Sequence, residues 1–144
     1  MSSADEVRIM NARDALALLS RRIYRKYGDE VLPIITEAWS KLGVGVGIAI
    51  GIWLPSRDLK VIAGAAFCGV VRGEIFEVSE DRMHGRSHDT CALGLDNTSR
   101  ELCQAVMSLD KAVVEAVAGK PVNMKIASSR AAGDEYCEVI YSWG

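Results

Sequence analysis

The residues of this sequence best suited to chemistry are its four cysteines and two histidines, and Cys103 stands in a notable relation to Asp110. Their spacing, C-x6-D, places both side chains on one face of a helix, two turns or about 10 Å apart. A thiol and a carboxylate at that distance cannot touch, but they can line one pocket, with the thiol as nucleophile and the carboxylate as an orienting group. The alternative is structural: Cys103 packs in the core, and Asp110 pairs with Lys111 or Arg100 at the edge of that core.

A second group of reactive residue types is formed by His84, His88 and Cys91, in the pattern H-x3-H-x2-C. Imidazole and thiolate both bind zinc, and imidazole can also serve as a general base. The spacing matches no zinc-finger signature, however, and histidines in a polar loop are more often solvated. We therefore favour solvated histidines over a metal site here.

The third feature is Cys137, which follows a Gly-Asp turn near the end of the sequence. Residues 122–128 and 137–141 alternate apolar with polar side chains, which predicts a β-hairpin around that turn. The alternation aligns Cys137 with Val139 and Tyr141, so the thiol is expected to face the core. Cys137 can be a core residue, a metal ligand or part of a reaction site, and free cysteine is among the most often buried residue types.

Hydrophobic periodicity predicts a mixed set of helices and strands that position these residues. Helices are predicted at 11–26, 31–42, 59–71 and 99–118, and a further strand at 74–82. The last helix has the clearest limits, because Thr98 and Glu101 form a capping box and Gly119 supplies a left-handed end. The basic residues of the first helix are expected on its solvated face. The combination predicts an α+β fold with a helical N-terminal half.

The segment 41–51, KLGVGVGIAIG, superficially suggests a phosphate-binding loop. Its spacing fits neither GxGxxG nor GxxxxGK[ST], since Ile50 stands where the third glycine is required. Nucleotide binding is therefore not supported. The glycines instead predict a place where two stretches of backbone approach closely.

Length and composition limit the functional classes. The 144 residues fit one domain, 1–144, and a net charge of -2 offers no basic surface for nucleic acid. The first ten residues are polar and acidic rather than basic and then apolar, so we expect a cytoplasmic protein whose cysteines are reduced thiols or ligands rather than disulfides. The two most apolar runs, 44–54 and 61–71, fall short of the ~20 residues that span a bilayer, so no membrane partner is expected.

Two of these features together resemble a known family. The segment RELCQAVMSLDKAVVEAVAGKP carries C-x6-D through Cys103 and Asp110, and the closing segment SSRAAGDEYCEVIY carries G-D-x-x-C through Cys137. In these motifs the chain resembles the L-2-amino-thiazoline-4-carboxylate hydrolase family and, more distantly, the 4-vinyl-reductase-like domains. The resemblance covers residues 100–141 and extends more weakly upstream through Cys91, which implies that the whole chain is one such domain.

This resemblance implies an antiparallel β-sheet packed against several α-helices, with a small-molecule pocket between them. For the sensor domains among the 4-vinyl-reductase-like relatives it also implies a zinc ion, held by Cys, Glu and two further Cys. Cys103 and Cys137 match the outer two positions, but Ile126 and Ser129 occupy the inner two, and neither is a normal zinc ligand. We therefore expect no metal and no cofactor. A zinc site rebuilt with Cys91, His84 or His88 is the disfavoured alternative.

The hydrolase relatives open the ring of a cyclic isothiourea acid to give N-carbamoyl-cysteine, by C-N/C-S chemistry. Such a reaction needs a base or a thiol nucleophile, and a cation for the carboxylate of the substrate. From resemblance and residue type, the candidate catalytic residues are Cys103, Asp110, His88 and Cys91. The candidate substrate-binding residues are Arg130, Arg86 and Cys137.

The main functional hypothesis is thus a small-molecule hydrolase acting on a heterocyclic amino acid derivative. The alternative is a non-catalytic small-molecule-binding or sensing domain of the 4-vinyl-reductase-like type, working as a homodimer through its apolar N-terminal helices. A sensor is normally fused to an output domain, and we expect none within 144 residues, which favours the enzyme. The scarcity of histidine and of clustered acid/base residues favours the alternative.

Overall fold

The computed structural model describes residues 9–53, 74–79, 81–88, 91 and 93–143. It confirms the α+β fold with an antiparallel sheet and a helical N-terminal half. The described helices are α1 (Ala12–Tyr27), the short 3-10 helix η2 (Gly28–Val31), α2 (Leu32–Trp53), α4 (Arg100–Val106), α5 (Ser108–Ala118) and the 3-10 helix η4 (Arg130–Ala132). The described strands are β1 (Glu74–Val78), β2 (Arg82–Ser87), β3 (Asn123–Ser128) and β4 (Cys137–Ser142). The helix predicted at 59–71 lies outside the described residues.

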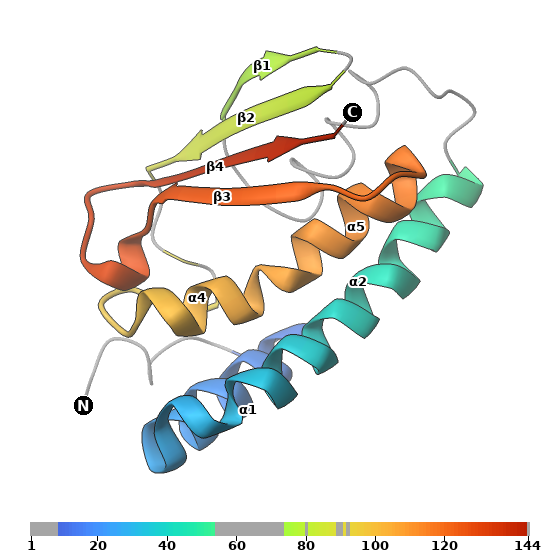
Figure 1. Ribbon diagram of the computed structural model, residues 1–144. Coiled ribbons are helices and arrows are strands. Elements are labelled where there is room, and N and C mark those ends of the chain that lie inside the picture. The colour runs from blue at the N-terminus through green and yellow to red at the C-terminus, as the bar shows by residue number, and fades with distance from the viewer. Residues whose placement is uncertain (1–8, 54–73, 80, 89–90, 92, 144) are drawn as a thin grey trace.

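The elements lie in layers (Figure 1). The four strands form one antiparallel sheet in the order β1-β2-β4-β3. Helices α4 and α5 follow one another along one face of this sheet, and α2 and α1 lie on the far side of them. The core therefore divides into two parts, one between the sheet and α5 and one between α4 and the two N-terminal helices.

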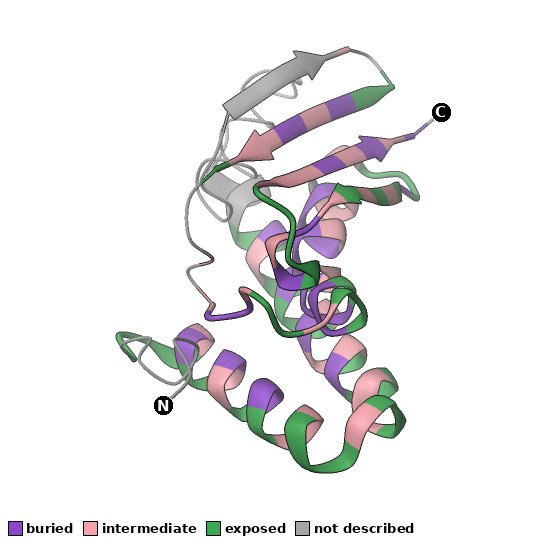
Figure 2. Ribbon diagram, turned by 90° about the vertical axis from the view of Figure 1, so that its left-hand side faces the viewer, coloured by how far each residue is buried: buried purple, intermediate pink, exposed green. Residues whose placement is uncertain are grey.

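The side chains of β2, β3 and β4 alternate between the core and the outer face. The cross-strand register places Tyr141 of β4 between Met83 of β2 and Met124 of β3, and all three point towards the helices. Figure 2 shows the resulting alternation of buried and less buried residues along β2 and β4. This confirms the predicted hairpin of β3 and β4 and its inward-facing residues.

Strand β2 differs from the sequence-based prediction, which places a polar loop around His84. The strand carries Arg82, His84 and Arg86 on its outer face, with only Met83 as a large apolar residue facing inwards. A strand with so little apolar alternation gives almost no sequence signal. Pairing with β1 on one side and β4 on the other determines its conformation.

Helix α2 packs directly against α5 through its glycines. A Cβ atom at Gly43 would lie 2.3 Å from the carbonyl oxygen of Leu109, and one at Gly47 would lie 2.6 Å from Cβ of Ala116. Contacts that short are impossible for real side chains, so both positions require glycine. The prediction that this segment allows close backbone approach is confirmed, although the helix continues to Trp53 rather than ending near residue 42.

The predicted helix at 99–118 is two helices. Its backbone is interrupted at Met107, which closes α4 and precedes α5. The N-cap is Ser99, whose hydroxyl accepts a hydrogen bond from Leu102 N at 3.2 Å, whereas the hydroxyl of Thr98 donates to the carbonyl of Leu95. The capping box predicted at Thr98 is therefore wrong by one residue, while the left-handed end at Gly119 is confirmed.

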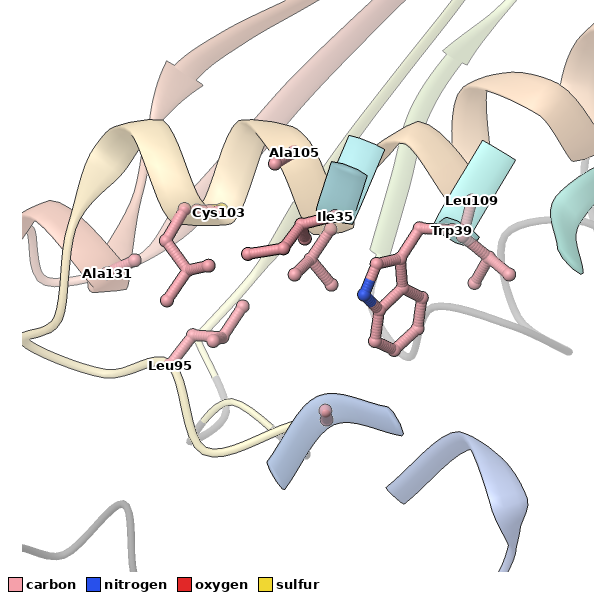
Figure 3. Packing of buried hydrophobic residues seen from close by; sticks show 10 residues of the cluster. Ile35, Trp39, Leu95, Cys103, Ala105, Leu109 and Ala131 are labelled. Carbon is pink, nitrogen blue, oxygen red and sulfur yellow. The ribbon is translucent and has the colours of Figure 1, made fainter. Parts of the chain in front are cut away.

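The N-terminal helices enclose the second part of the core. Trp39 of α2 is fully buried, and its indole nitrogen donates to the hydroxyl of Ser20 on α1 at 3.0 Å. Figure 3 shows Trp39 beside Leu109, with Ile35 between Trp39 and Cys103. Arg21 of α1 is also buried and donates to the carbonyl of Leu93, so its assignment to a solvated face is wrong.

By length and composition alone, one helical stretch among the described residues, Ala12–Ala49, is long and apolar enough to cross a membrane. Core helices of soluble proteins can meet the same criterion. One side of α2 is covered by α5 through Gly43 and Gly47. The absence of a membrane partner stays a prediction.

Candidate functional site

Cys103 lies on α4 with its side chain in the part of the core shared with the N-terminal helices. It is 9% exposed and packs near Leu95 and Ala131 (Figure 3). Burial raises the pKa of its thiol to about 11, although a hydrogen bond with the hydroxyl of Ser129 acts in the opposite direction. A thiolate is the reactive form of cysteine, so this environment disfavours Cys103 as a nucleophile near neutral pH.

The structure brings Cys91 and Cys137 towards Cys103, at the end of the molecule where η4 meets α4. Burial raises the pKa of both thiols. Cys91 and Cys137 also lie close enough to Cys103 for an ionised thiol at either position to raise the pKa of Cys103. The sulfur of Cys137 accepts a hydrogen bond from the backbone N–H of Arg130 at 3.5 Å. Three of the predicted site residues thus form one thiol cluster that favours the neutral form.

Arg130, a predicted carboxylate-binding residue, is held by Asp96. Its Nε donates to Asp96 Oδ1 at 3.1 Å and its terminal nitrogen donates to Oδ2 at 3.2 Å. A further hydrogen bond runs from Arg130 to the carbonyl of Glu135. Asp96 Oδ1 also accepts from the backbone N–H of Cys91, so the pair ties together the segments that carry two of the cysteines. The guanidinium nitrogens of Arg130 that a substrate carboxylate would need already donate hydrogen bonds to Asp96 and Glu135.

Asp110 lies on α5 and is 5% exposed. Burial raises the pKa of its carboxyl to about 7, with the charge of Arg13 acting to lower it. The predicted rim position beside Lys111 or Arg100 is therefore wrong: Lys111 approaches Glu115, and Arg100 donates to the carbonyl of Ile126. Asp110 is a buried carboxyl inside the molecule.

Tyr141, which the strand alternation predicts only to face the core, packs from the sheet side in one cluster with Val113 and Val114, the residues of α5 that follow Asp110 by three and four positions. It is 1% exposed, and its hydroxyl has no hydrogen-bond partner among the described residues. Burial raises the pKa of Tyr141 well above its ordinary value, and the nearby Asp110 and Cys103 raise it further. The alternation of β4 could have identified Tyr141 as inward-facing, but only the packing of α5 on the sheet places it beside a carboxyl.

The surroundings of Asp110 and Tyr141 are apolar and rich in methionine. Met83, Met107 and Met124 belong to, or pack against, the cluster that joins α5 to the sheet. Methionine is unbranched and polarizable, so it adapts to differently shaped neighbours. Two polar side chains within such a layer could fix the orientation of a small apolar molecule.

His88 and Arg86 lie apart from this layer, on the outer side of the sheet. His88 is exposed and its ring lies 5.2 Å from that of Tyr136, while the guanidinium of Arg86 lies 4.4 Å above the same ring. Arg86 also forms an ion pair with Glu138. The pKa of Glu138 is lowered, and the largest cause is its 2.5 Å hydrogen bond with His84. The structure does not bring His88 and Arg86 together with Cys103 and Asp110.

The residues do not fit the zinc site that the 4-vinyl-reductase-like resemblance implies. Ser129 is fully buried and its hydroxyl is engaged by Cys103 and the backbone of Ala131. Ile126 packs against both parts of the core. In the part of the chain that the structure describes, no group of three His, Cys, Asp or Glu residues is arranged to hold a metal ion.

A shallow surface depression of about 530 Å³ lies beside the start of α4. It is lined by Tyr24, Asn97, Thr98, Ser99, Glu101, Ala131, Ala132 and Gly133. None of the candidate residues from the sequence analysis lines it. Its polar, open character is unlike the buried layer around Asp110 and Tyr141.

Comparison with known proteins identifies a related fold. No family model and no curated protein matches the sequence. Among solved structures, the chain is similar to the phenol-responsive sensory domain of the transcription activator PoxR, determined with phenol. The TM-score is 0.68 at 16% identity, covering 94% of this chain and 76% of that one. The likeness supports the fold of the more distant resemblance, to the 4-vinyl-reductase-like domains, and gives no support to the hydrolase family.

Proposed function

We propose that this chain is a non-catalytic small-molecule-binding domain of the sensory type. The observation that carries the proposal is its similarity in fold, over nearly its whole length, to a domain that responds to phenol. The buried layer between α5 and the sheet supports it, because this layer combines adaptable apolar side chains with two polar ones, Asp110 and Tyr141. Ligand sites commonly have that composition.

The chemistry of the predicted catalytic residues supports binding over hydrolysis. Cys103 is a buried thiol with a pKa of about 11, and His88 lies on the outer side of the sheet beside Tyr136. A nucleophile and its base must be within hydrogen-bond reach of each other or of a shared substrate. The arrangement of these residues therefore gives the hydrolase hypothesis less support than the sensory one.

The test compares stabilisation by a ligand with turnover. We expect phenol to raise the midpoint of thermal unfolding in a saturable way, since a ligand bound only to the folded state at about 100 times its Kd adds roughly 2.7 kcal/mol. We expect L-2-amino-thiazoline-4-carboxylate to remain unchanged after incubation with the protein. Formation of N-carbamoyl-cysteine by the wild type, and its loss in Cys103→Ala, would establish the hydrolase instead.

The homodimer and the cytoplasmic location belong to the same proposal. Large apolar side chains on the outward side of the N-terminal helices support a second copy as partner: Ile34 is 64% exposed and Ile48 is 57% exposed. Sedimentation equilibrium of the wild type and of an Ile34→Glu, Ile48→Glu variant tests the dimer. A wild type that stays monomeric at tens of micromolar would remove it.

A further inference from the structure

The hydroxyl of Tyr141 is an unusual group in this molecule because it is buried and has no hydrogen-bond partner among the described residues. An unsatisfied buried donor is costly, and native structures contain few of them. The strand register leaves Tyr141 between Met83 and Met124, and neither thioether is more than a weak acceptor. The position therefore retains unused capacity both to donate and to accept a hydrogen bond.

Asp110 lies on the same side of α5 as Val113 and Val114, which follow it by three and four residues and pack in one cluster with Tyr141. Its side chain is almost fully buried, and no hydrogen bond joins it to Tyr141 among the described residues. One group that can donate and accept at once would supply the missing partner of the Tyr141 hydroxyl and bridge it to Asp110. A hydroxyl is the smallest such group.

We propose that Tyr141 and Asp110 are the polar anchor of the small-molecule site, and that the site takes a compact apolar molecule carrying one neutral hydroxyl group. This inference rests on the proposed sensory function and adds the ligand class and the residues that select it. The ligand hydroxyl donates to Asp110 and accepts from Tyr141. The rest of the molecule packs against the methionine side chains of the layer.

The acidic side chain of Asp110 also determines what the site rejects. A ligand carboxylate would bring a negative charge into a buried layer beside another acid, which is strongly unfavourable. This excludes heterocyclic acids of the kind that the hydrolase hypothesis requires. A methyl ether has an acceptor but no donor, so it would leave Asp110 without its hydrogen bond.

The experiment uses four probes of similar size: phenol, anisole, toluene and benzoate. Dissociation constants are measured by calorimetry on the full chain at pH 8, where Asp110 is mostly ionised and phenol is mostly neutral. We expect phenol to bind at least about ten-fold more tightly than anisole or toluene, the usual value of a hydrogen bond to a charged group. Benzoate is expected not to bind.

Variants assign this preference to the two residues. Tyr141→Phe and Asp110→Asn are expected to reduce the advantage of phenol over toluene to about three-fold or less. Tyr136→Phe removes the same hydroxyl from a ring that lies outside the layer, against Arg86 and His88, and is expected to keep the wild-type preference. Urea unfolding without ligand checks folding: Tyr141→Phe should be as stable as the wild type or more stable, because it removes an unsatisfied hydroxyl.

The outcomes separate this inference from the function beneath it. Equal binding of phenol, anisole and toluene would overturn the anchor and leave a small-molecule site in place. A preference for phenol that survives in Tyr141→Phe and in Asp110→Asn would overturn the assignment of these residues. Failure of all four probes to bind would overturn both the anchor and the proposed function.

Discussion

Gly47 of α2 and Ala116 of α5 are close enough that a Cβ atom on the glycine would lie 2.6 Å from the Cβ of the alanine. The same added atom would lie 3.2 Å from Cα of Val113. Since Val113 and its neighbours also support the apolar layer against the sheet, this contact sets the distance of α2 from the proposed site.

Gly47→Ala is expected to destabilise the protein by about 1 to 3 kcal/mol, because the two backbones must move apart. Gly45→Ala is the matched control, since nothing lies within 4 Å of a Cβ at that position. Alanine is the better helix former, so the control is expected to be neutral or up to about 1 kcal/mol more stable. Urea unfolding measures both, and equal effects of the two substitutions would contradict the close packing.

Asp96→Asn is expected to lower the free energy of unfolding by about 1 to 2 kcal/mol, through loss of the charge-assisted pair with Arg130. The pair is partly buried and connects the segment before α4 to η4. Glu37→Gln breaks the solvent-exposed pair with Lys41 and serves as the control, with no measurable effect expected. A stable Asp96→Asn variant would show that the pair does not hold these segments together.

The stability of the protein is expected to fall as pH rises through about 7, because of Asp110. Its pKa is raised from the ordinary 3.8 to about 7 by burial, so the folded state holds a proton that the unfolded state releases. The stabilisation of the folded state by the proton on Asp110 is fully present below about pH 4 and is lost as pH rises to and through 7. A full shift of this size corresponds to about 4 kcal/mol.

The acidic groups whose charges act between Asp110, Cys103 and Tyr141 do not confuse this measurement, because the pKa values of Cys103 and Tyr141 are raised and lie above that pH window. Urea unfolding of the wild type and of Asp110→Asn between pH 5 and 8 isolates the effect, since the variant lacks the titrating carboxyl. Parallel pH profiles for the two proteins would show that Asp110 is not buried as described.

Cys103 is expected to resist alkylation in the folded protein. With a pKa of about 11, only about one thiol in a thousand is ionised at pH 8, and burial limits access further. Peptide mapping after iodoacetamide treatment should show labelling at Cys103 at least about a hundred-fold slower in buffer than in urea. Rapid labelling of the native protein would restore Cys103 as a nucleophile.

Much of the fold could be predicted from the sequence, because the relevant signals are local. The periodicity of α1, the left-handed end at Gly119 and the alternation of β3 and β4 each reflect a few neighbouring residues. Strand β2 could not be predicted, since its polar residues form strand structure only through pairing with β1 and β4. The interruption at Met107 likewise has no breaker residue to signal it.

The sequence by itself determined which residues could do chemistry and that Cys103, Asp110 and Cys137 lie on predictable faces of a helix and a strand. Only the tertiary structure decided what those residues can do. Burial of Cys103 and Asp110 favours their neutral forms, and the pairing of Arg130 with Asp96 uses the cation that a substrate acid would need. The physical reason is that pKa values and hydrogen-bond partners depend on groups distant in sequence, such as Tyr141 beside Asp110.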